Sequence, residues 1–377
     1  MNRRSMLSLP LVATLVMTLA MPVPAMAAAP TLVARVSQDG LAFPWDVAFA
    51  PGGQMFVTER PGRVRVYATG SPGASLLATS RIPHVHAEGE AGVMGIAVDP
   101  AFDRNRLIYV CASRDKDGQW VNQVIRYRVT GSWTLQFNRY IIKNGMRANT
   151  IHNGCAVEVG PDLKVWVSMG EAGREIDAQN PNRRNGKILR INRGGTVPSD
   201  NPILPGANGR SIIYSMGHRN PQGITFDLRN GRAYAVEHGP NVNDEINWIR
   251  PGKNYGWPCV TGNSSAYHTG YAACSANAPF TKPAWHSVGG TLATSGGTFV
   301  RGTNWESFAN DMFVSQLKQS DLRRFSLANA GTDLVYSATY YDNRWGRLRA
   351  AVLGPGNRLF LTTSNGSNDK VIRITPT

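Results

Sequence analysis

The segment PWDVAFAPGGQMFVTERPG, residues 44–62, contains two apolar, β-rich runs joined by a Pro-Gly-Gly turn. This pattern is typical of a β-hairpin. Comparable phrases begin five more times along the chain, at Gly92, His152, Asn220, Thr294 and Arg349. The starts lie 48, 60, 68, 74 and 55 residues apart, so each repeat has room for two further strands. Six such units predict an all-β protein, a six-bladed β-propeller of four-stranded antiparallel sheets; two stacked β-sandwiches are the alternative.

The ends of the chain fit a closed ring. The runs TLVARVS (residues 31–37) and KVIRITP (residues 370–376) could share one blade and close the propeller. Because no internal linker interrupts the repeats, we expect residues 28–377 to form a single domain, with residues 254–290 as its main excursion.

The composition excludes other classes of protein. Among 377 residues there are 39 Gly and 23 Pro, which would repeatedly break the helices of a bundle or coiled coil. Intrinsic disorder is excluded as well, because 9 Trp, 12 Tyr and 12 Phe supply ample aromatic material for a core.

Residues 1–27 have the pattern of a secretory signal peptide. Arg3 and Arg4 form a short basic region, an apolar run follows from Met6 to Met21, and Ala25-Met26-Ala27 is a small-residue cleavage site. No later stretch approaches the roughly 20 apolar residues of a membrane span. We therefore expect a periplasmic or secreted protein that does not span a membrane.

Export favours disulfides among the four cysteines. Cys259 and Cys274 lie in one Gly/Ser/Ala-rich loop, and their pairing is expected. Cys111 and Cys155 each lie in a strand-like run and could pair only if those strands are neighbours. Buried free thiols are the alternative. No CxxC motif or Cys/His cluster indicates zinc.

The chain is strongly basic, with 40 Lys and Arg against 25 Asp and Glu and a formal net charge of +15. Nucleic acid is not an expected partner, because no nucleic-acid motif is present and the protein is expected outside the cytoplasm. An anionic envelope surface or an acidic redox partner suits this charge better.

Two residues of the third and fourth repeats have the chemistry of catalysis. His152 titrates near neutrality and could remove a proton from an alcohol, although a lone histidine is more often structural. Arg219, followed by Asn220 at a Pro-Gln-Gly turn, offers a fixed donor for a carboxylate or a developing oxyanion, unless it only satisfies loop carbonyls.

The later repeats supply oxygen ligands and cations. The loop HGPN with Asp244, Glu245 and Asn247 offers hard oxygen atoms that suit Ca²⁺, or else forms a solvated acidic turn. Arg347 and Arg349, two apart on an expected strand, would point the same way. With Arg219 and Lys318 they could form a cationic pocket for a multiply anionic ligand; scattered surface charges are the alternative.

These phrases resemble the soluble glucose/sorbosone dehydrogenases that depend on pyrroloquinoline quinone (PQQ), also called aldose sugar dehydrogenases. The most specific segments are GHRNPQG, EHGPNVNDEIN with NYGWP, AQNPNRRNGKILRIN with VPSDNP, and TLATSG. The resemblance covers nearly the whole mature chain. It implies a six-bladed propeller that uses PQQ and calcium to oxidise a sugar hydroxyl.

The resemblance also implies roles for individual residues. His152 matches the general base, and Arg219 matches the residue that stabilises the developing oxyanion. The residues that match cofactor contacts are Arg219, Asn220, Thr291, Lys318, Arg347 and Arg349. Glu90 matches a substrate contact. The carbonyls of Gly239 and Pro240 match ligands of the calcium beside the cofactor, and Glu245 and Tyr255 match a second, structural calcium site.

Several positions depart from the family pattern. Ile151 replaces an acidic residue that often precedes the base, so a carboxylate partner for His152 must come from elsewhere. Gly289 stands at an aromatic, cofactor-stacking position, for which Trp285 or His286 could substitute. Ala350 replaces an Asp, and Glu171 stands where Asp is common. These departures prevent the transfer of a substrate preference.

The expected activity is oxidation of an aldose or polyol hydroxyl by hydride transfer to PQQ, with Ca²⁺ as its electrostatic partner and an external electron acceptor. One rival is a calcium-dependent hydrolase on the same propeller, which requires more inward carboxylates. Another is a non-catalytic binding propeller that has lost PQQ. If His152, Arg219, Lys318 and Arg349 do not surround one cavity, the oxidation mechanism fails.

Overall fold

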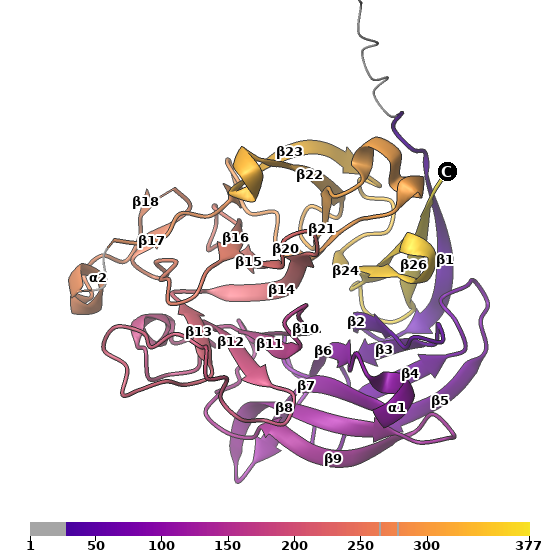
Figure 1. The fold of residues 1–377 in the computed structure, drawn as a ribbon, viewed down its shortest axis with the longest axis horizontal. Helices are drawn as coiled ribbons and strands as arrows, with labels where there is room; N and C mark the ends of the chain where they lie inside the picture. The colour runs from indigo at the N-terminus through magenta and orange to yellow at the C-terminus, as the bar shows by residue number, and fades with distance from the viewer. Residues whose placement is uncertain (1–27, 264, 277–278) are drawn as a thin grey trace, which may run out of the picture.

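The computed structural model describes residues 28–263, 265–276 and 279–377, and the expected signal peptide of residues 1–27 lies outside them. The described chain forms six four-stranded antiparallel sheets arranged in a ring (Figure 1). The predicted six-bladed β-propeller is therefore confirmed, and the alternative of two stacked sandwiches is wrong.

In blades 1 to 5 the strands follow the order of the sequence. Blade 1 consists of β2 (Pro44–Phe49), β3 (Met55–Glu59), β4 (Arg63–Tyr67) and β5 (Leu76–Arg81). Blade 2 consists of β6 (Val93–Val98), β7 (Leu107–Lys116), β8 (Gln119–Val129) and β9 (Leu135–Ile142), with helix α1 (Phe102–Asn105) between its first two strands. Blade 3 consists of β10 (Gly154–Val159), β11 (Lys164–Met169), β12 (Lys187–Asn192) and β13 (Ile213–Met216).

The remaining blades carry the longer connections. Blade 4 consists of β14 (Asn220–Asp227), β15 (Arg232–His238), β16 (Glu245–Ile249) and β19 (Trp285–His286). Blade 5 consists of β20 (Thr294–Phe299), β21 (Met312–Gln316), β22 (Leu322–Ala328) and β23 (Asp333–Tyr340). Blade 6 consists of β24 (Leu348–Gly354), β25 (Arg358–Thr363), β26 (Asp369–Pro376) and β1 (Leu32–Leu41).

Each of the six repeated phrases forms the first two strands of one blade. The first strands of successive blades contact one another around the propeller axis. The ring is closed by β1, which pairs with β26 from Leu32 opposite Pro376 to Leu41 opposite Asp369. The predicted sharing of one blade by the two ends of the chain is confirmed.

A register shift occurs at the beginning of the first strand in every blade. In blade 1 it lies between Pro44 and Val47, and in blade 6 between Leu348 and Ala351. The other four shifts occur after Val93, Gly154, Pro221 and Thr294. Such bulges redirect side chains from the regular alternation. The residues within four of these shifts, Asp46, Gln222, Ser295 and Arg349, line one axial cavity.

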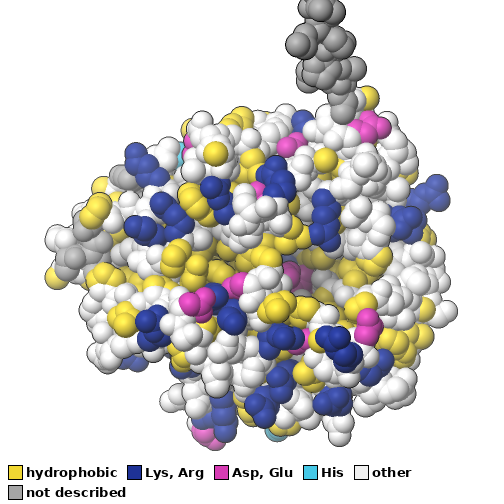
Figure 2. Space-filling model, in the orientation of Figure 1, with side chains coloured by type: hydrophobic (Ala, Val, Ile, Leu, Met, Phe, Trp, Pro, Cys, Tyr) yellow, Lys and Arg dark blue, Asp and Glu magenta, His cyan; other side chains and the backbone are white. Residues whose placement is uncertain are grey.

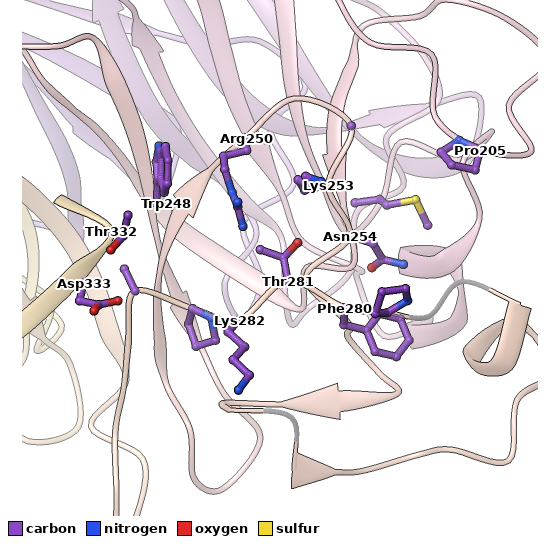
Figure 3. Close-up of a pocket in the computed structure, with 15 residues that line it drawn as sticks. Pro205, Trp248, Arg250, Lys253, Asn254, Phe280, Thr281, Lys282, Thr332 and Asp333 are labelled. Carbon is purple, nitrogen blue, oxygen red and sulfur yellow. The ribbon is translucent and has the colours of Figure 1, made fainter. Parts of the chain in front are cut away.

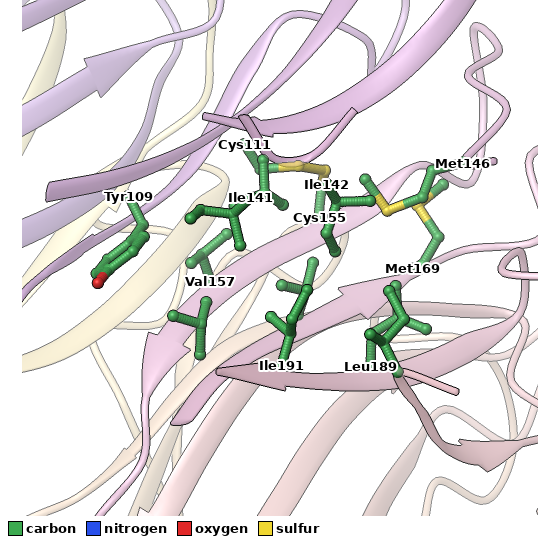
Figure 4. Close-up of a cluster of buried hydrophobic side chains, with 14 of the residues drawn as sticks. Tyr109, Cys111, Ile141, Ile142, Met146, Cys155, Val157, Met169, Leu189 and Ile191 are labelled. Carbon is green, nitrogen blue, oxygen red and sulfur yellow. A yellow bond between two sulfur atoms is a disulfide. The ribbon is translucent and has the colours of Figure 1, made fainter. Parts of the chain in front are cut away.

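Blades 2 and 3 are joined through a hydrophobic cluster and a disulfide (Figure 4). Cys111 of β7 is bonded to Cys155, which lies in β10 of the next blade. Ile141, Ile142 and Met146 lie in the same cluster. The two strand-like runs are therefore neighbours, which was the condition for this pairing, and the alternative of free thiols is wrong.

The excursion of residues 254–290 lies at the periphery of the ring (Figure 1). It contains the two-stranded sheet of β17 (Val260–Thr261) and β18 (Ser265–Ala266), and helix α2 (Ala272–Ala276). The predicted Cys259–Cys274 disulfide holds this loop.

The surface carries its positive charge broadly, since Lys and Arg side chains are spread over the face shown in Figure 2 rather than gathered in one patch. Within the described part of the chain, no helix has the length and hydrophobicity needed to cross a bilayer.

Candidate active site

The predicted site residues come together at one edge of the ring, where the first strand of each blade begins and the second strand ends. Glu90 precedes β6, His152 precedes β10, and Arg219 directly precedes β14. Because successive strands are antiparallel, the residues that follow β11 and β15 return to this same edge. Blades 2, 3 and 4 therefore contribute loops to one channel mouth.

His152 is held in position by a carboxylate from its own blade. Its Nδ1 atom is hydrogen-bonded to Oε1 of Glu171, which follows β11. The His152 side chain is 17% exposed, whereas the Glu171 side chain is 3% exposed. The backbone carbonyl of His152 accepts a hydrogen bond of 2.9 Å from Ala172 N–H. The carboxylate partner expected from elsewhere than position 151 is thus Glu171, and Ile151 itself is exposed.

Arg219 is connected to this pair through the backbone of Glu171. Its carbonyl accepts a hydrogen bond from Glu171 N–H at 2.9 Å, which ties the two loops together. Its backbone N–H donates to Glu237 Oε1, and its guanidinium carbon lies 5.2 Å from the centroid of the Trp257 ring. The buried Nε atom has no partner among the described residues. Burial lowers the pKa of Arg219, and Glu171, Glu90 and Glu237 oppose this shift.

The Arg219 backbone is anchored by a buried trio of polar residues. His218 Nδ1 lies 2.9 Å from Glu237 Oε2, and His218 Nε2 lies 2.9 Å from Ser215 Oγ. The three residues are 0–3% exposed. They therefore support the loop from beneath and are not accessible to a substrate.

Glu90, before blade 2, and Asn220, at the start of blade 4, are hydrogen-bonded to each other. Asn220 Nδ2 donates to Glu90 Oε2 at 3.2 Å, and Asn220 Oδ1 accepts from Gly154 N–H at 3.0 Å. Glu90 also accepts from Asn153 N–H at 3.4 Å. Asn220 is fully buried, so it fixes the Glu90 carboxylate and the beginning of β10 at the same time.

Three of the four predicted cations lie close to His238, a residue that was not predicted to belong to the site. His238 ends β15, and burial lowers its pKa well below the ordinary value, with Arg349, Arg219, His152 and Arg347 adding to the shift. These five residues therefore share one electrostatic environment. The buried Nε2 atom of His238 has no described partner. His238 is part of the EHGP segment, in which the sequence indicated a role only for Gly239 and Pro240.

The two arginines of the sixth repeat differ from their predicted arrangement. Arg347 precedes β24 and is exposed, whereas Arg349 lies within the register shift and is 5% exposed. Strand alternation therefore does not orient them. Arg349 Nη1 donates to Gln222 Oε1 at 2.6 Å, and its guanidinium carbon lies 3.7 Å from the Trp45 ring centroid. Burial lowers the pKa of Arg349 to about 9, a shift that Glu90 partly opposes.

Lys318 and Thr291 lie on adjoining loops of blade 5. Lys318 is exposed, and its backbone N–H donates to Leu292 O at 3.0 Å. Thr291 Oγ1 donates to the buried Asp244 carboxylate at 2.9 Å. Asp244 also accepts from Gly239 N–H at 2.8 Å and from Ala293 N–H at 2.9 Å. Asp244 thus fastens the Thr291 loop to the Gly239 loop.

All four predicted metal residues line one small cavity beside Arg219 and His238: Gly239, Pro240, Glu245 and Tyr255. Burial raises the pKa of Glu245 to about 8, and the neighbouring Glu237 adds to the shift. Glu245 accepts hydrogen bonds from Gly262 N–H at 2.7 Å and from Asn247 Nδ2 at 3.0 Å. The Tyr255 hydroxyl donates to Trp248 O and accepts from Arg250 N–H. Across the described residues, no group of three or more His, Cys, Asp or Glu side chains forms a metal cluster.

Trp285 and His286 were expected to replace the aromatic side chain that is absent at Gly289, but both have other contacts. The Trp285 ring packs edge-on against Phe325, with centroids 4.9 Å apart. His286 Nδ1 lies 3.2 Å from Asn243 Oδ1. Gly289 itself is exposed.

A separate cavity of about 820 Å³ lies on the side of blade 4 and contains none of the predicted site residues (Figure 3). Arg250, Lys253 and Lys282 line it, together with Trp248 and Asp333. The residues predicted for catalysis and cofactor binding therefore lie outside this larger space.

Comparison with solved structures places the chain among propeller dehydrogenases. The soluble aldose sugar dehydrogenase of Escherichia coli in its apo form has a TM-score of 0.81 and 27% identity, covering 92% of this chain and all of that one. The PQQ-bound aldose sugar dehydrogenase of Streptomyces coelicolor has a TM-score of 0.75 and 26% identity, covering 93% of this chain and all of that one.

Sequence comparison gives the family. The family model for glucose/sorbosone dehydrogenase matches residues 41–373. Quinoprotein glucose dehydrogenase B of Acinetobacter calcoaceticus is 31% identical over 271 residues, which cover 65% of this chain and 56% of that protein. The chain belongs to the glucose/sorbosone dehydrogenase family of PQQ-dependent sugar dehydrogenases.

Proposed function

We propose that the protein oxidises a hydroxyl group of an aldose or a related sugar-like alcohol, with PQQ and Ca²⁺ bound at the channel mouth. The observation that carries this proposal is the placement of Arg219, Arg347 and Arg349 around His238, beside the His152–Glu171 pair. A proton acceptor and an uncompensated set of cations thus lie in one site.

The cations suit a multiply anionic cofactor. Among the described residues, none of Arg219, Lys318, Arg347 and Arg349 forms an ion pair with a carboxylate. Arg349 is buried, and a buried positive charge without a counterion is costly, so an anionic ligand would stabilise it. These four residues, with Asn220 and Thr291, would hold the carboxylates of PQQ.

His152 would accept the proton of the substrate hydroxyl. Since the Glu171 carboxylate occupies Nδ1, the Nδ1–H tautomer is favoured and Nε2 is left as the basic atom. The buried carboxylate also stabilises the imidazolium ion that forms. PQQ, when bound, supplies the two-electron chemistry as the acceptor of the substrate hydride.

Arg219 and Glu90 would contact different groups of the substrate. The unpartnered Nε–H of Arg219 is available to an oxygen that gains negative charge. Glu90, fixed by Asn220, would accept hydrogen bonds from sugar hydroxyls.

The Gly239–Pro240 turn fits a hard cation. No donor among the described residues pairs with either of these two backbone carbonyls. Carbonyl oxygens of this kind are suitable Ca²⁺ ligands, and Glu245 with Tyr255 would serve a second site. Electrons would leave to an external acceptor, in the periplasm or outside the cell.

The test is reconstitution of the purified protein with PQQ and Ca²⁺, followed by dye-linked oxidation of a panel of aldoses and polyols. We expect stoichiometric PQQ binding and turnover of at least one aldose. Binding of PQQ without turnover of any sugar would instead support a non-catalytic propeller, and absence of both would refute the proposal.

A hydrolytic function has less support. The Ser215–His218–Glu237 contacts have the distances of a nucleophilic triad, but Ser215 is 0% exposed and cannot reach a substrate. The calcium-dependent hydrolase also does not account for the unpaired cations around His238.

A further inference from the structure

A cavity of about 370 Å³ lies at the far end of the propeller channel. It is lined by the ends of β10, β14, β20 and β24, the inner strands whose beginnings lie at the channel mouth. This cavity, which we call the far cavity, is therefore on the opposite face of the ring from the candidate active site. Its volume lies within the range of about 300–1,000 Å³ that is usual for small-molecule sites.

The walls of the far cavity are mainly apolar. They include Val159, Ile224, Phe226, Leu228, Phe299 and Leu353. Phe226 and Phe299 are 9% and 8% exposed, whereas Leu228, on the turn after β14, is 55% exposed. Leu228 therefore lies at the rim, and the apolar body of a ligand inside the cavity would be removed from water.

One carboxyl group between these walls has no partner. Glu158, near the end of β10, lines the far cavity and also the axial cavity. Its side chain forms no hydrogen bond or ion pair with any residue that the structure describes. Asp46 differs, because it accepts hydrogen bonds from Val47 N–H at 2.8 Å and Ile96 N–H at 3.1 Å. The hydrogen-bonding capacity of Glu158 is thus unused.

The charged groups around the far cavity leave Glu158 without a counterion. Arg229 pairs with Asp227 at 2.8 Å, and Arg301 is exposed to solvent, which screens its charge. Arg349 borders only the axial cavity. The charge that does influence Glu158 is that of Asp46, which has the same sign, and burial together with this charge raises the pKa of Glu158 well above its ordinary value.

Two classes of cation could supply the counterion. A Ca²⁺ ion takes 6–8 oxygen ligands, whereas the walls of the far cavity are mainly apolar, and the described residues contain no cluster of three or more His, Cys, Asp or Glu side chains. An organic ammonium ion needs a carboxylate at one end and buries its hydrocarbon part against the walls. The far cavity therefore favours the organic ion.

We propose that the far cavity binds a primary ammonium ion with an apolar body, and that the ammonium group pairs with the carboxylate of Glu158. This site is separate from the channel mouth and requires neither PQQ nor a sugar. The formal net charge of the chain is +15, so the protein as a whole repels cations, and binding of an ammonium ion must come from local contacts.

The test is calorimetric titration of the purified full-length protein at pH 8 with phenethylamine and with its neutral analogue, phenethyl alcohol. We expect the amine to bind about 10–100-fold more tightly, because its hydrogen bond joins two charged groups. Glu158→Gln should remove most of this preference, after circular dichroism confirms the fold. Glu88→Gln is the matched control and should retain the preference, since its side chain is 61% exposed and does not line the far cavity.

Two further measurements examine the carboxylate and the walls separately. Lowering the pH from 8 to 5 should weaken binding of phenethylamine, because Glu158 takes up a proton while the amine, like a lysine side chain, stays protonated. Binding of the alcohol should change little. Leu228→Ala should weaken binding of both probes by about threefold, because part of the apolar wall is removed.

Equal affinities for the amine and the alcohol would overturn the proposal, as would a preference that survives Glu158→Gln. Loss of the preference in Glu88→Gln as well would assign the binding to surface charge. If neither probe bound, the far cavity would not be a ligand site. None of these outcomes depends on PQQ or on sugar oxidation, so the proposed function is tested independently.

Discussion

The channel contains two charged levels of opposite sign. At the mouth, Arg219 and Arg349 lie close to His238 without a carboxylate partner. Deeper along the same inner strands, Asp46 and Glu158 line the axial cavity, which Arg349 also borders. Burial raises the pKa of Asp46 to about 7, and burial together with Asp46 raises the pKa of Glu158 well above its ordinary value.

The two levels differ in how their charge can be neutralised. A carboxyl group becomes neutral by taking up a proton, so the deeper level needs no ligand. The arginines stay charged at neutral pH, since even the lowered pKa of Arg349 is about 9. Only the mouth therefore requires an anion from outside, which is where the proposed cofactor would bind.

The largest expected effect is on the proton acceptor at the mouth. His152→Ala should lower kcat by roughly 10²–10⁴-fold, because general-base catalysis is lost. PQQ binding should change little, because His152 bears none of the proposed cofactor contacts. Glu171→Gln should lower kcat less and shift the pH profile, since the amide cannot stabilise the imidazolium as the carboxylate does.

Steady-state kinetics and PQQ titration with each variant check this prediction. An equal loss of turnover and PQQ binding in His152→Ala would show that the histidine is structural. The mouth would then have no catalytic group to distinguish it from the deeper level.

The propeller architecture could be predicted from the sequence because the six inner hairpins are local patterns. Each phrase carries its own turn, and the phrase at Pro44 is sufficient to predict the first two strands of blade 1. The sequence also indicated candidate site residues, but it did not indicate their hydrogen-bond partners. Glu171 was noted only as a departure, whereas the structure pairs it with His152.

What escaped prediction depends on contacts between blades. The register shift around Arg349 buries that side chain against Gln222, and strand alternation alone cannot indicate this. His238 was overlooked because its role appears only when arginines from blades 4 and 6 meet around it. Such features have no local signal, because they arise from the packing of distant segments.

A smaller effect is expected for the buried arginine. Arg349→Gln should weaken PQQ binding by about 10–100-fold, because a charge-assisted hydrogen bond to a buried carboxylate is lost. Arg35→Gln is the matched control, since it removes the same charge from an exposed position on β1. PQQ titrations with both variants, after circular dichroism confirms the fold, make the comparison. Equal affinities would remove Arg349 from the proposed cofactor site.

The deeper level gives a prediction about pH. A carboxyl group with a raised folded-state pKa contributes stability that is fully present below its unfolded-state pKa and is lost as the pH rises from there through the folded-state pKa. For Asp46, whose pKa is raised from 3.8 to about 7, that loss extends from about pH 4 to about pH 7. The pKa of Glu158 is raised as well, so Glu158→Gln should match the parent protein at pH 4 and be more stable by about 1–2 kcal/mol at pH 8.

Chemical denaturation at both pH values measures this difference. Glu88→Gln is the control, because its side chain is 61% exposed, and we expect no such pH-dependent gain from it. A gain of equal size at pH 4 would mean that Glu158 is ionised there, and the assignment of a proton-neutralised level would be wrong.

The smallest effect is expected from the exposed edge of the cationic site. Lys318 is exposed, so water and salt screen its attraction for a carboxylate. Lys318→Gln should weaken PQQ binding by about threefold at low salt, and the difference should vanish near 1 M salt, where the Debye length is about 3 Å. Arg349→Gln should keep most of its effect under the same conditions, because buried charges are screened less. PQQ titrations of both variants across a salt series separate the two contributions. If salt abolished both effects equally, the buried arginine would not contact the ligand, and the mouth would be only a diffuse positive surface.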